Sequence, residues 1–187
     1  MFIDLEIFAV IFAFLYLFLA MKQHIACWYA AFISTFLYIL IYWDVSLYME
    51  SVLNVYYLVM AIYGWSNWNR KSKINKNYVI SWSYLNHLIV VVLILILTII
   101  SGFYLSKTDA VYPYLDSFTT WASVTTTFMV AQKVLSNWIF WIIINSVAIF
   151  LNLDRELYFT VYLLLIYQLM SVFGYYQWRK SFYDNKA

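Results

Sequence analysis

The sequence YGWSNW at residues 63–68 recurs as the similar sequence FGYYQW at residues 173–178. This shift of 110 positions aligns the first part of the chain with the second. The same shift, without a gap, places Trp28 on Trp138. It also pairs Asp44 with Asp154, Leu47-Tyr48 with Leu157-Tyr158, Tyr57 with Tyr167, and Met60 with Met170. The chain therefore contains a duplicated unit of about 67 residues.

Composition indicates that this unit belongs in a membrane. Of 187 residues, 66% are hydrophobic and 11% are charged, and there are only 3 Gly and 1 Pro. A soluble domain could not hide so much apolar surface from water, so a bilayer is the expected solvent. Cutting the chain at charged and turn-prone residues leaves seven apolar segments, each near the roughly 20 residues that one membrane crossing requires. They are residues 4–20, 26–43, 47–66, 84–103, 115–132, 137–153 and 157–176. The expected fold class is all-α integral membrane, with seven transmembrane helices.

The first apolar segment resembles a secretory signal in length but not in its flanks. It begins with Asp4 and Glu6 rather than with lysines, and no small-x-small cleavage site precedes Cys27. We therefore expect a retained helix. Cys27 is the only cysteine, which excludes an internal disulfide. No metal-ligand cluster or redox pair is visible, so neither a metal nor another cofactor is expected.

Positive charges are unequally shared between the two sides of the predicted spans. One side receives nine Lys and Arg residues and the other receives two. The nine are Lys22, Arg70, Lys71, Lys73, Lys76, Lys133, Arg179, Lys180 and Lys186, and the two are Lys107 and Arg155. Because cytoplasmic loops carry the excess of Lys and Arg, we expect the amino terminus outside and the carboxyl terminus in the cytoplasm. The net charge of +2 calls for no nucleic-acid partner.

The duplication implies an internal symmetry. We divide the chain into a first three-helix repeat at residues 4–70, a basic loop with a connector helix at 71–113, and a second three-helix repeat at 114–180. A single connector helix makes the repeats parallel, related by an axis along the membrane normal, which is a symmetry found in transporters. The connector holds the plainest apolar run, Leu88 to Leu97, and is expected to face lipid.

The sixth predicted helix carries the most distinctive polar pattern. Trp138, Trp141 and Asn145 are spaced i, i+3 and i+7, so two indoles and a carboxamide share one stripe. The first repeat holds Trp28, Ala31 and Thr35 at the equivalent positions. Because only the second repeat carries both the second indole and the carboxamide, we expect an asymmetric ligand. Tryptophans near helix ends also anchor in the lipid headgroup region. We expect that role for Trp28, Trp68 and Trp178, and leave it open for Trp138.

Two other helices offer candidate binding residues. Asn54 and Tyr57 lie one turn apart on the third helix, and the second repeat has Leu164 in place of Asn54. An interhelical hydrogen bond is the alternative role for Asn54. The fifth helix presents a face of hydroxyls, of which Thr120 and Ser123 are the binding candidates. Packing is the alternative there, because such hydroxyls also bond to carbonyls of the preceding turn.

The predicted spans lack ionisable residues near their midplane. Proton-driven and voltage-driven proteins usually keep such residues at that depth, so passive movement of a solute is the simplest interpretation. An integral-membrane enzyme would need a nucleophile with its base, a metal cluster or paired carboxylates, and the spans bring none together. We therefore expect no enzymatic activity. A scaffolding protein is the remaining alternative, but it would not explain the one-sided Asn54 and Asn145.

Several segments resemble the PnuC family of bacterial vitamin transporters. They are Leu5-Glu6-Ile7, Tyr63-Gly64-Trp65-Ser66-Asn67-Trp68, Asp116-Ser117-Phe118-Thr119-Thr120, Asn137-Trp138-x-x-Trp141-x-x-x-Asn145, Leu157-Tyr158 and Gly174-Tyr175-Tyr176-Gln177-Trp178. The match follows the family order over essentially the whole chain, and the sixth-helix motif is its most specific part.

The resemblance implies a fold, a function and partners. Members of this family have a three-plus-one-plus-three helix arrangement, similar to SWEET sugar transporters, and form homotrimers in the bacterial inner membrane. Their archetypal substrate is nicotinamide riboside, which moves by facilitated diffusion and is trapped when a cytoplasmic kinase phosphorylates it. Related PnuT-type proteins carry thiamine, which is the alternative substrate here, along with other B vitamins.

Departures from the family pattern bear on the substrate. Asn54 stands where a longer Gln is expected, and Trp65-Ser66 stands where a tryptophan pair is expected. Asn145 is an amide where some relatives have an acid, which favours nicotinamide riboside over thiamine. The expected substrate-binding set is Trp138, Trp141, Asn145, Asn54, Tyr57, Trp65, Thr120 and Ser123.

Overall fold

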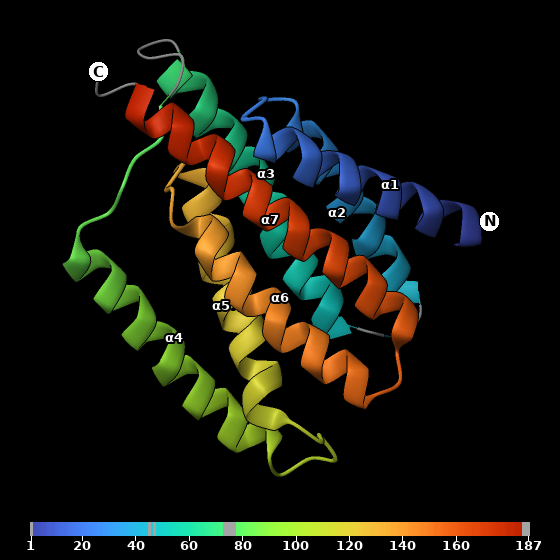
Figure 1. The fold of residues 1–187 in the computed structure, drawn as a ribbon. Coiled ribbons are helices and arrows are strands. Elements are labelled where there is room, and N and C mark those ends of the chain that lie inside the picture. The colour runs from blue at the N-terminus through green and yellow to red at the C-terminus, as the bar shows by residue number, and fades with distance from the viewer. Residues whose placement is uncertain (1, 45, 47, 73–77, 185–187) are drawn as a thin grey trace.

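The computed structural model describes residues 2–44, 46, 48–72 and 78–184. Over those residues the chain is all-helical, with seven helices and no strand (Figure 1). The helices are α1 (Phe2–Met21), α2 (Cys27–Asp44), α3 (Tyr48–Ser72), α4 (Tyr84–Leu105), α5 (Pro113–Ala131), α6 (Asn137–Asp154) and α7 (Tyr158–Asp184). Each overlaps one predicted apolar segment, and the single proline is the first residue of α5, as predicted.

The helices form two three-helix units and one outlying helix. In the first unit α2 packs against α1 and α3, and in the second α6 packs against α5 and α7. The units meet where α3 packs on α5 and where α1 packs on α7. Helix α4 packs on α5 and stands apart from the rest of the bundle (Figure 1). This is the three-plus-one-plus-three arrangement predicted from the sequence.

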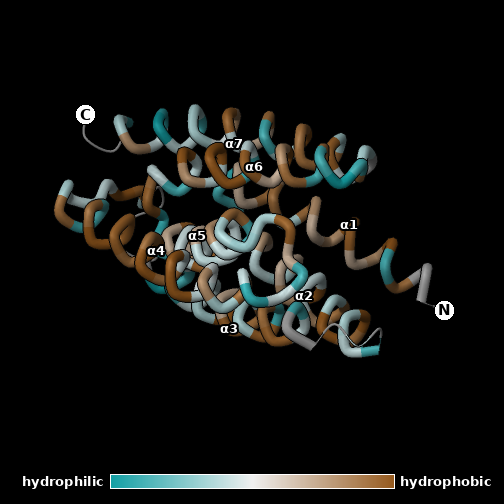
Figure 2. The backbone as a smooth tube through the Cα atoms, turned by 90° about the horizontal axis from the view of Figure 1, so that it is seen from below, coloured by the Kyte–Doolittle hydropathy of each residue, from teal (hydrophilic) through white to brown (hydrophobic). Residues whose placement is uncertain are grey.

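The surface of the bundle is apolar. By length and composition, α2, α4 and α6 could each cross a membrane, and Leu5–Met21 is a shorter apolar helix. Apolar residues run along the outward faces, most plainly on α4 (Figure 2). Exposed α4 side chains include Leu85, Ile89, Leu93, Ile96, Ile99 and Ile100. Such a surface is stable in lipid rather than in water, so the chain is a multi-pass membrane protein.

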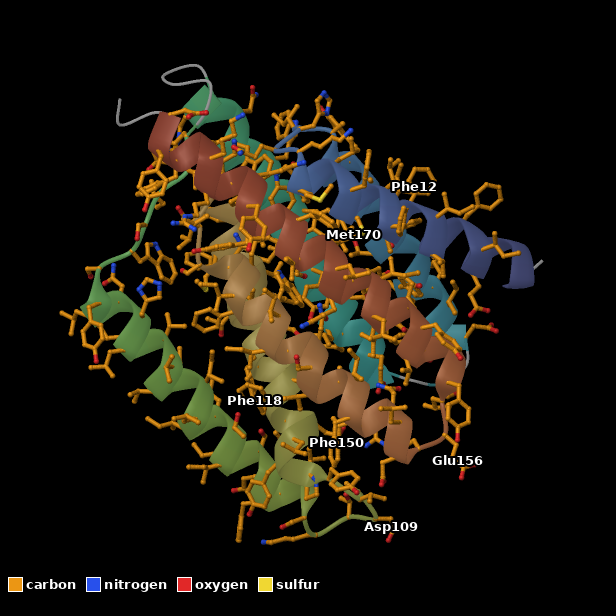
Figure 3. All side chains as sticks on the ribbon, viewed as in Figure 1. Phe12, Asp109, Phe118, Phe150, Glu156 and Met170 are labelled. Carbon is orange, nitrogen blue, oxygen red and sulfur yellow. The ribbon has the colours of Figure 1, made fainter. Side chains whose placement is uncertain are left out.

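Charge distinguishes the two ends of the bundle. We call one the basic end, which holds Lys22, Arg70, Lys133, Arg179 and Lys180. The opposite, acidic end holds Asp44, Glu50, Asp116, Asp154 and Glu156. In Figure 3, Glu156 and Asp109 mark the acidic end, far from the C-terminal end of α7. Helix α1 begins at the acidic end and α7 ends at the basic end (Figure 1).

The duplication extends to backbone detail. Gln23 and Lys133, 110 positions apart, follow α1 and α5 in the left-handed region, with φ of 57° and 58°. Ser46 and Glu156 repeat the pattern after α2 and α6, with φ of 62° and 58°. Such values are uncommon for residues other than glycine, so their recurrence is specific. The two units therefore share a fold as well as a sequence pattern.

Helices α3 and α7 are longer than predicted. Their apolar segments were expected to end at residues 66 and 176, whereas the helices continue to Ser72 and Asp184. The extra turns are polar, so a hydropathy criterion stops before them. They remain helical and carry Trp68 and Trp178, which are 2% and 0% exposed.

Tryptophans at the basic end interlock inside the protein, so the headgroup-anchor prediction was wrong. Trp28 is 2% exposed and Trp138 is 1% exposed. The Trp28 and Trp68 rings meet edge to face at 5.3 Å and 86°, and Trp138 and Trp178 do so at 5.4 Å and 86°. Trp68 and Trp178 join the pairs at 5.9 Å. We call these four residues the tryptophan cluster. Lipid headgroups do not reach it.

Candidate functional site

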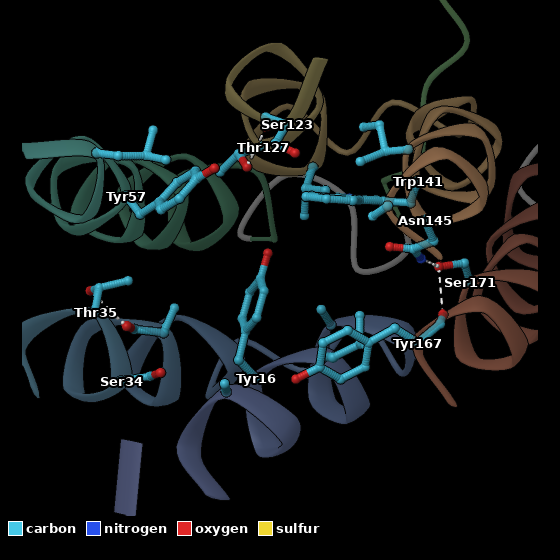
Figure 4. Close-up of a pocket in the computed structure, with 18 of the residues that line it drawn as sticks. Tyr16, Ser34, Thr35, Tyr57, Ser123, Thr127, Trp141, Asn145, Tyr167 and Ser171 are labelled. Carbon is cyan, nitrogen blue, oxygen red and sulfur yellow. Dashed lines mark hydrogen bonds between the residues drawn. The ribbon is translucent and has the colours of Figure 1, made fainter. Parts of the chain in front are cut away.

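A cavity of about 510 Å³ lies between the two units. Helices α1, α2, α3, α5, α6 and α7 all contribute to its wall, whereas α4 supplies no lining residue (Figure 4). Its size falls within the roughly 300–1,000 Å³ of small-molecule sites. Trp28 and Trp138, at the start of α2 and α6, form the floor of the cavity and also belong to the tryptophan cluster.

Repeat-equivalent residues face one another across this cavity. The lining pairs, each 110 positions apart, are Ala13/Ser123, Leu17/Thr127, Ala20/Val130, Trp28/Trp138, Ala31/Trp141, Ser34/Ile144, Thr35/Asn145, Tyr38/Ala148, Asn54/Leu164 and Tyr57/Tyr167. The cavity therefore lies on the axis that relates the two units. Most pairs differ in size or polarity, so the wall is chemically asymmetric. Such a wall suits a ligand with two unlike ends.

Asn145 is the buried amide of the site, only 6% exposed. Its Nδ2 donates to the Ser171 hydroxyl at 3.4 Å, and that hydroxyl donates to the Tyr167 carbonyl at 2.8 Å. Figure 4 shows the amide nitrogen toward Ser171 and the amide oxygen toward the cavity. The contact with α7 orients Asn145 and leaves its oxygen available as an acceptor.

The two indoles of α6 occupy different depths. Trp138 is buried at the floor, and its ring fills the space above Gly174, where an added Cβ would lie 2.7 Å from the ring. Gly64 gives Trp28 the same close approach in the first unit. The indole nitrogens of Trp28 and Trp138 are buried without a hydrogen-bond partner. Trp141 is partly buried and lies beside Asn145 on the cavity wall (Figure 4).

Helix α3 contributes Asn54 and Tyr57 to the cavity wall. The Asn54 amide donates to the Glu50 carbonyl of its own helix at 2.9 Å, and not across to another helix. The Tyr57 ring points across the cavity toward Ser123 and Thr127 on α5 (Figure 4). Both predicted residues therefore line the cavity from the side opposite Asn145.

The hydroxyl face of α5 also lines the cavity, through Thr119, Thr120, Ser123 and Thr127. Thr120 donates to the Asp116 carbonyl at 3.0 Å, and Thr127 donates to the Ser123 carbonyl at 2.8 Å. These are the bonds within one helix that the packing alternative predicted. Each oxygen still has a lone pair that can accept from a ligand.

Trp65 is the predicted site residue that the structure does not place in the cavity. It is 37% exposed, and its Nε1 donates to the hydroxyl of Tyr29, itself 57% exposed, at 2.9 Å. It lies about 80° around the helix from Tyr57, and its ring contacts the Tyr29 ring of α2 within the first unit. Trp65, predicted as a binding residue, does not line the cavity.

Several lining residues were not predicted as site residues. Tyr16 rises from α1 into the middle of the cavity, with Tyr167 beside it (Figure 4). The others include Trp28, Ser34, Thr35, Tyr38 and Ser171. The shift of 110 positions would have found some of them, because Tyr167, Trp28 and Thr35 are the equivalents of Tyr57, Trp138 and Asn145. Tyr16 is equivalent to Thr126, which does not line the cavity, so the repeat gives no signal for it.

The lining is aromatic and polar but carries no formal charge. Among the described residues that form it, there is no Asp, Glu, Lys, Arg or His. Nor do the described residues hold a group of three His, Cys, Asp or Glu that could bind a metal ion. The wall offers hydroxyls, amides and ring faces, which bind a small polar aromatic molecule by hydrogen bonds and stacking.

Charged groups occur at the acidic rim instead. Arg155 Nη2 lies 2.8 Å from an Asp116 carboxylate oxygen, which ties the start of α5 to the turn after α6. Both side chains are about one-third exposed, so the pair contributes at most about 1 kcal/mol. Beside it, a hydrogen bond with Asp154 raises the pKa of the half-buried Tyr112.

Comparison with known families identifies this architecture. The family model described as nicotinamide mononucleotide transporter matches residues 4–180. The chain belongs to this family. A member of the nicotinamide mononucleotide transporter family is a membrane transporter and not an enzyme, in agreement with the sequence prediction.

A solved structure has the same fold. The chain is similar to the crystal structure of the vitamin B3 transporter PnuC, with a TM-score of 0.73 and 20% identity. The match covers 95% of this chain and 81% of that one. The resemblance to the PnuC family predicted from sequence motifs is thereby confirmed, and the nicotinamide mononucleotide transporter fold accounts for all seven described helices.

Proposed function

We propose that this chain carries nicotinamide riboside across the bacterial inner membrane by facilitated diffusion. The observation that supports this most directly is the uncharged, asymmetric cavity on the axis between the two units. A solute bound there is equally distant from both units, and rocking of one unit against the other exposes it to each side in turn. The described lining residues include no Asp, Glu, Lys, Arg or His that could couple transport to protons.

Nicotinamide riboside matches the two kinds of group in the wall. Its pyridinium ring is cationic and aromatic, and a contact with the face of Trp141 is worth roughly 0.5–2 kcal/mol. Its carboxamide and ribose hydroxyls can bond to Asn145, Asn54 and the Thr120–Ser123 face. A lining without carboxylates holds a cation loosely enough to release it. The proposed contacts are Trp138, Trp141, Asn145, Asn54, Tyr57, Thr120 and Ser123, together with Tyr16 and Tyr167.

The orientation follows from the charge distribution. We place the basic end in the cytoplasm, because nine of eleven Lys and Arg residues were assigned to that side. The amino terminus is then outside. Phosphorylation by a cytoplasmic kinase traps the substrate, and by resemblance to the family the functional assembly is a homotrimer in the lipid bilayer.

Calorimetric titration of the purified protein with nicotinamide riboside and, separately, with thiamine tests this proposal. We expect heat with the riboside and none with thiamine. Binding of thiamine alone would assign the same cavity to a thiamine carrier and contradict our choice of substrate. The matched controls are Asn145→Leu, inside the cavity, and Trp65→Leu, outside it. Only the first should weaken binding of the riboside.

A further inference from the structure

We propose that Trp68 and Trp178 form a latch that closes the basic end beneath the cavity, and that Trp28 and Trp138 couple this latch to the occupant of the cavity. The inference rests on the proposed transport function, since only a transporter has to open this end. It concerns two residues, Trp68 and Trp178, that do not line the cavity.

Each half of the latch crosses from one unit to the other. Trp68 Nε1 on α3 donates to the Val130 carbonyl on α5 at 3.2 Å. Trp178 Nε1 on α7 donates to the Ala20 carbonyl on α1 at 3.0 Å. The two donors are 110 positions apart, and so are the two acceptors. The two hydrogen bonds are therefore equivalent under the internal repeat. They occupy the two interfaces, α3 with α5 and α1 with α7, along which the units must separate.

Neighbouring contacts reinforce this end. Asn67 Nδ2 donates to the Ala131 carbonyl at 2.7 Å, and Gln23 Nε2 donates to the Ser181 hydroxyl at 2.8 Å. The Lys133 ammonium lies 4.4 Å from the centre of the Trp68 ring. Because these bonds join different units, they are made in the closed arrangement and must break when the basic end opens. The structure is therefore closed at this end.

The cavity floor communicates with the latch through ring contacts. Trp28 and Trp138 line the cavity and touch Trp68 and Trp178 edge to face at 5.3 Å and 5.4 Å. Their own indole N–H groups are buried without an acceptor. Because each of these rings contacts both the cavity and a latch indole, an occupant that packs on Trp28 or Trp138 holds the latch rings in the closed arrangement. An occupied cavity should accordingly favour the closed latch.

The only cysteine of the chain is a reporter of the latch. Cys27 is 0% exposed and packs in the same core as Trp28, Trp68 and Trp178. Its thiol can react with N-ethylmaleimide only when the basic end opens. The rate of alkylation, measured by mass spectrometry against unfolded protein, reports opening without any substrate. A failure of the latch and a failure of the proposed substrate are therefore distinguishable.

Trp68→Phe and Trp178→Phe each remove one latch bond and keep an aromatic ring. The Val130 and Ala20 carbonyls keep a backbone donor, from Lys133 and Gln23 respectively. We expect Cys27 to react faster by on the order of tenfold in each variant, the effect of one net hydrogen bond on an opening equilibrium. The control is Trp65→Phe, which removes an indole bond of 2.9 Å within one unit. Its Cys27 rate should stay within about twofold of the unchanged protein.

Saturating nicotinamide riboside should slow Cys27 alkylation in the unchanged protein and slow it less in Trp68→Phe. Equal rates in Trp68→Phe, Trp178→Phe and Trp65→Phe would overturn the latch. Faster alkylation on adding the riboside would overturn the coupling. If the latch variants react faster but the riboside changes no rate and binds to no variant, the latch stands and the proposed substrate fails.

Discussion

Replacing Gly174 by Ala should destabilise the protein by driving a methyl group into the Trp138 ring. The added Cβ would lie 2.7 Å from three ring atoms, whereas carbon atoms in contact are about 3.5–4.0 Å apart. Trp138 or α7 must therefore shift by about 1 Å. Trp138 is 1% exposed and packs edge to face on Trp178, so a shift of its ring disturbs the tryptophan cluster. Overpacking of this kind costs about 1–3 kcal/mol.

Gly102→Ala on α4 is the matched control. Its Cβ would also meet a ring, that of Tyr114 at 2.4 Å, but Tyr114 is 46% exposed and can swing away. Both substitutions gain the same helix propensity, about 1 kcal/mol, so their difference isolates the cost of packing. We expect Gly174→Ala to melt roughly 2–12 °C below Gly102→Ala.

Intrinsic tryptophan fluorescence in detergent measures these melting temperatures. Combining Gly174→Ala with Trp138→Phe supplies a second check, because a smaller ring accommodates the methyl group. The two changes should therefore cost less together than the sum of their separate costs. Equal melting of Gly174→Ala and Gly102→Ala, or additive costs in the double variant, would refute the reasoning.

Three further predictions concern function and the rim. Asn145→Leu should fold normally but bind nicotinamide riboside roughly 5–150-fold more weakly by calorimetry, because a ligand group loses its partner at a cost of about 1–3 kcal/mol; unchanged affinity would remove Asn145 from the site. Riboside uptake should be flat between pH 6 and 8 and insensitive to a protonophore, since the described cavity lining carries no carboxylate, imidazole or ammonium; a pH-dependent rate would contradict passive movement. Asp116→Asn should lower stability by no more than about 1 kcal/mol in a thermal melt, because its ion pair with Arg155 is about one-third exposed and screened; a larger loss would show that this pair is structural.

The fold could be predicted from the sequence because two strong signals agree. Hydropathy located all seven described helices, and the shift of 110 positions related the units. Neither signal could locate the ends of α3 and α7, since the last turns are polar and held by tertiary packing of Trp68 and Trp178. Tryptophan near a helix end fits both a headgroup anchor and a buried interlock, and the choice depends on the neighbouring helices.

The cavity residues were predictable where helix geometry was applied. Trp138, Trp141 and Asn145 came from spacing on one stripe, and the structure places all three in the cavity wall. Trp65 was taken from the family pattern, although about 80° separates it from Tyr57 around the helix. Tyr16 stands in an apolar segment with no polar neighbour to mark it, and only the packing of α1 against the other unit brings it into the cavity.

Uptake of labelled nicotinamide riboside into proteoliposomes, without any ion gradient, tests the central claim most directly. A passive carrier should fill the vesicles until the inside and outside concentrations are equal, and Asn145→Leu should fill them far more slowly while inserting normally. Absence of uptake with correctly folded protein, or accumulation above the external concentration, would contradict the account.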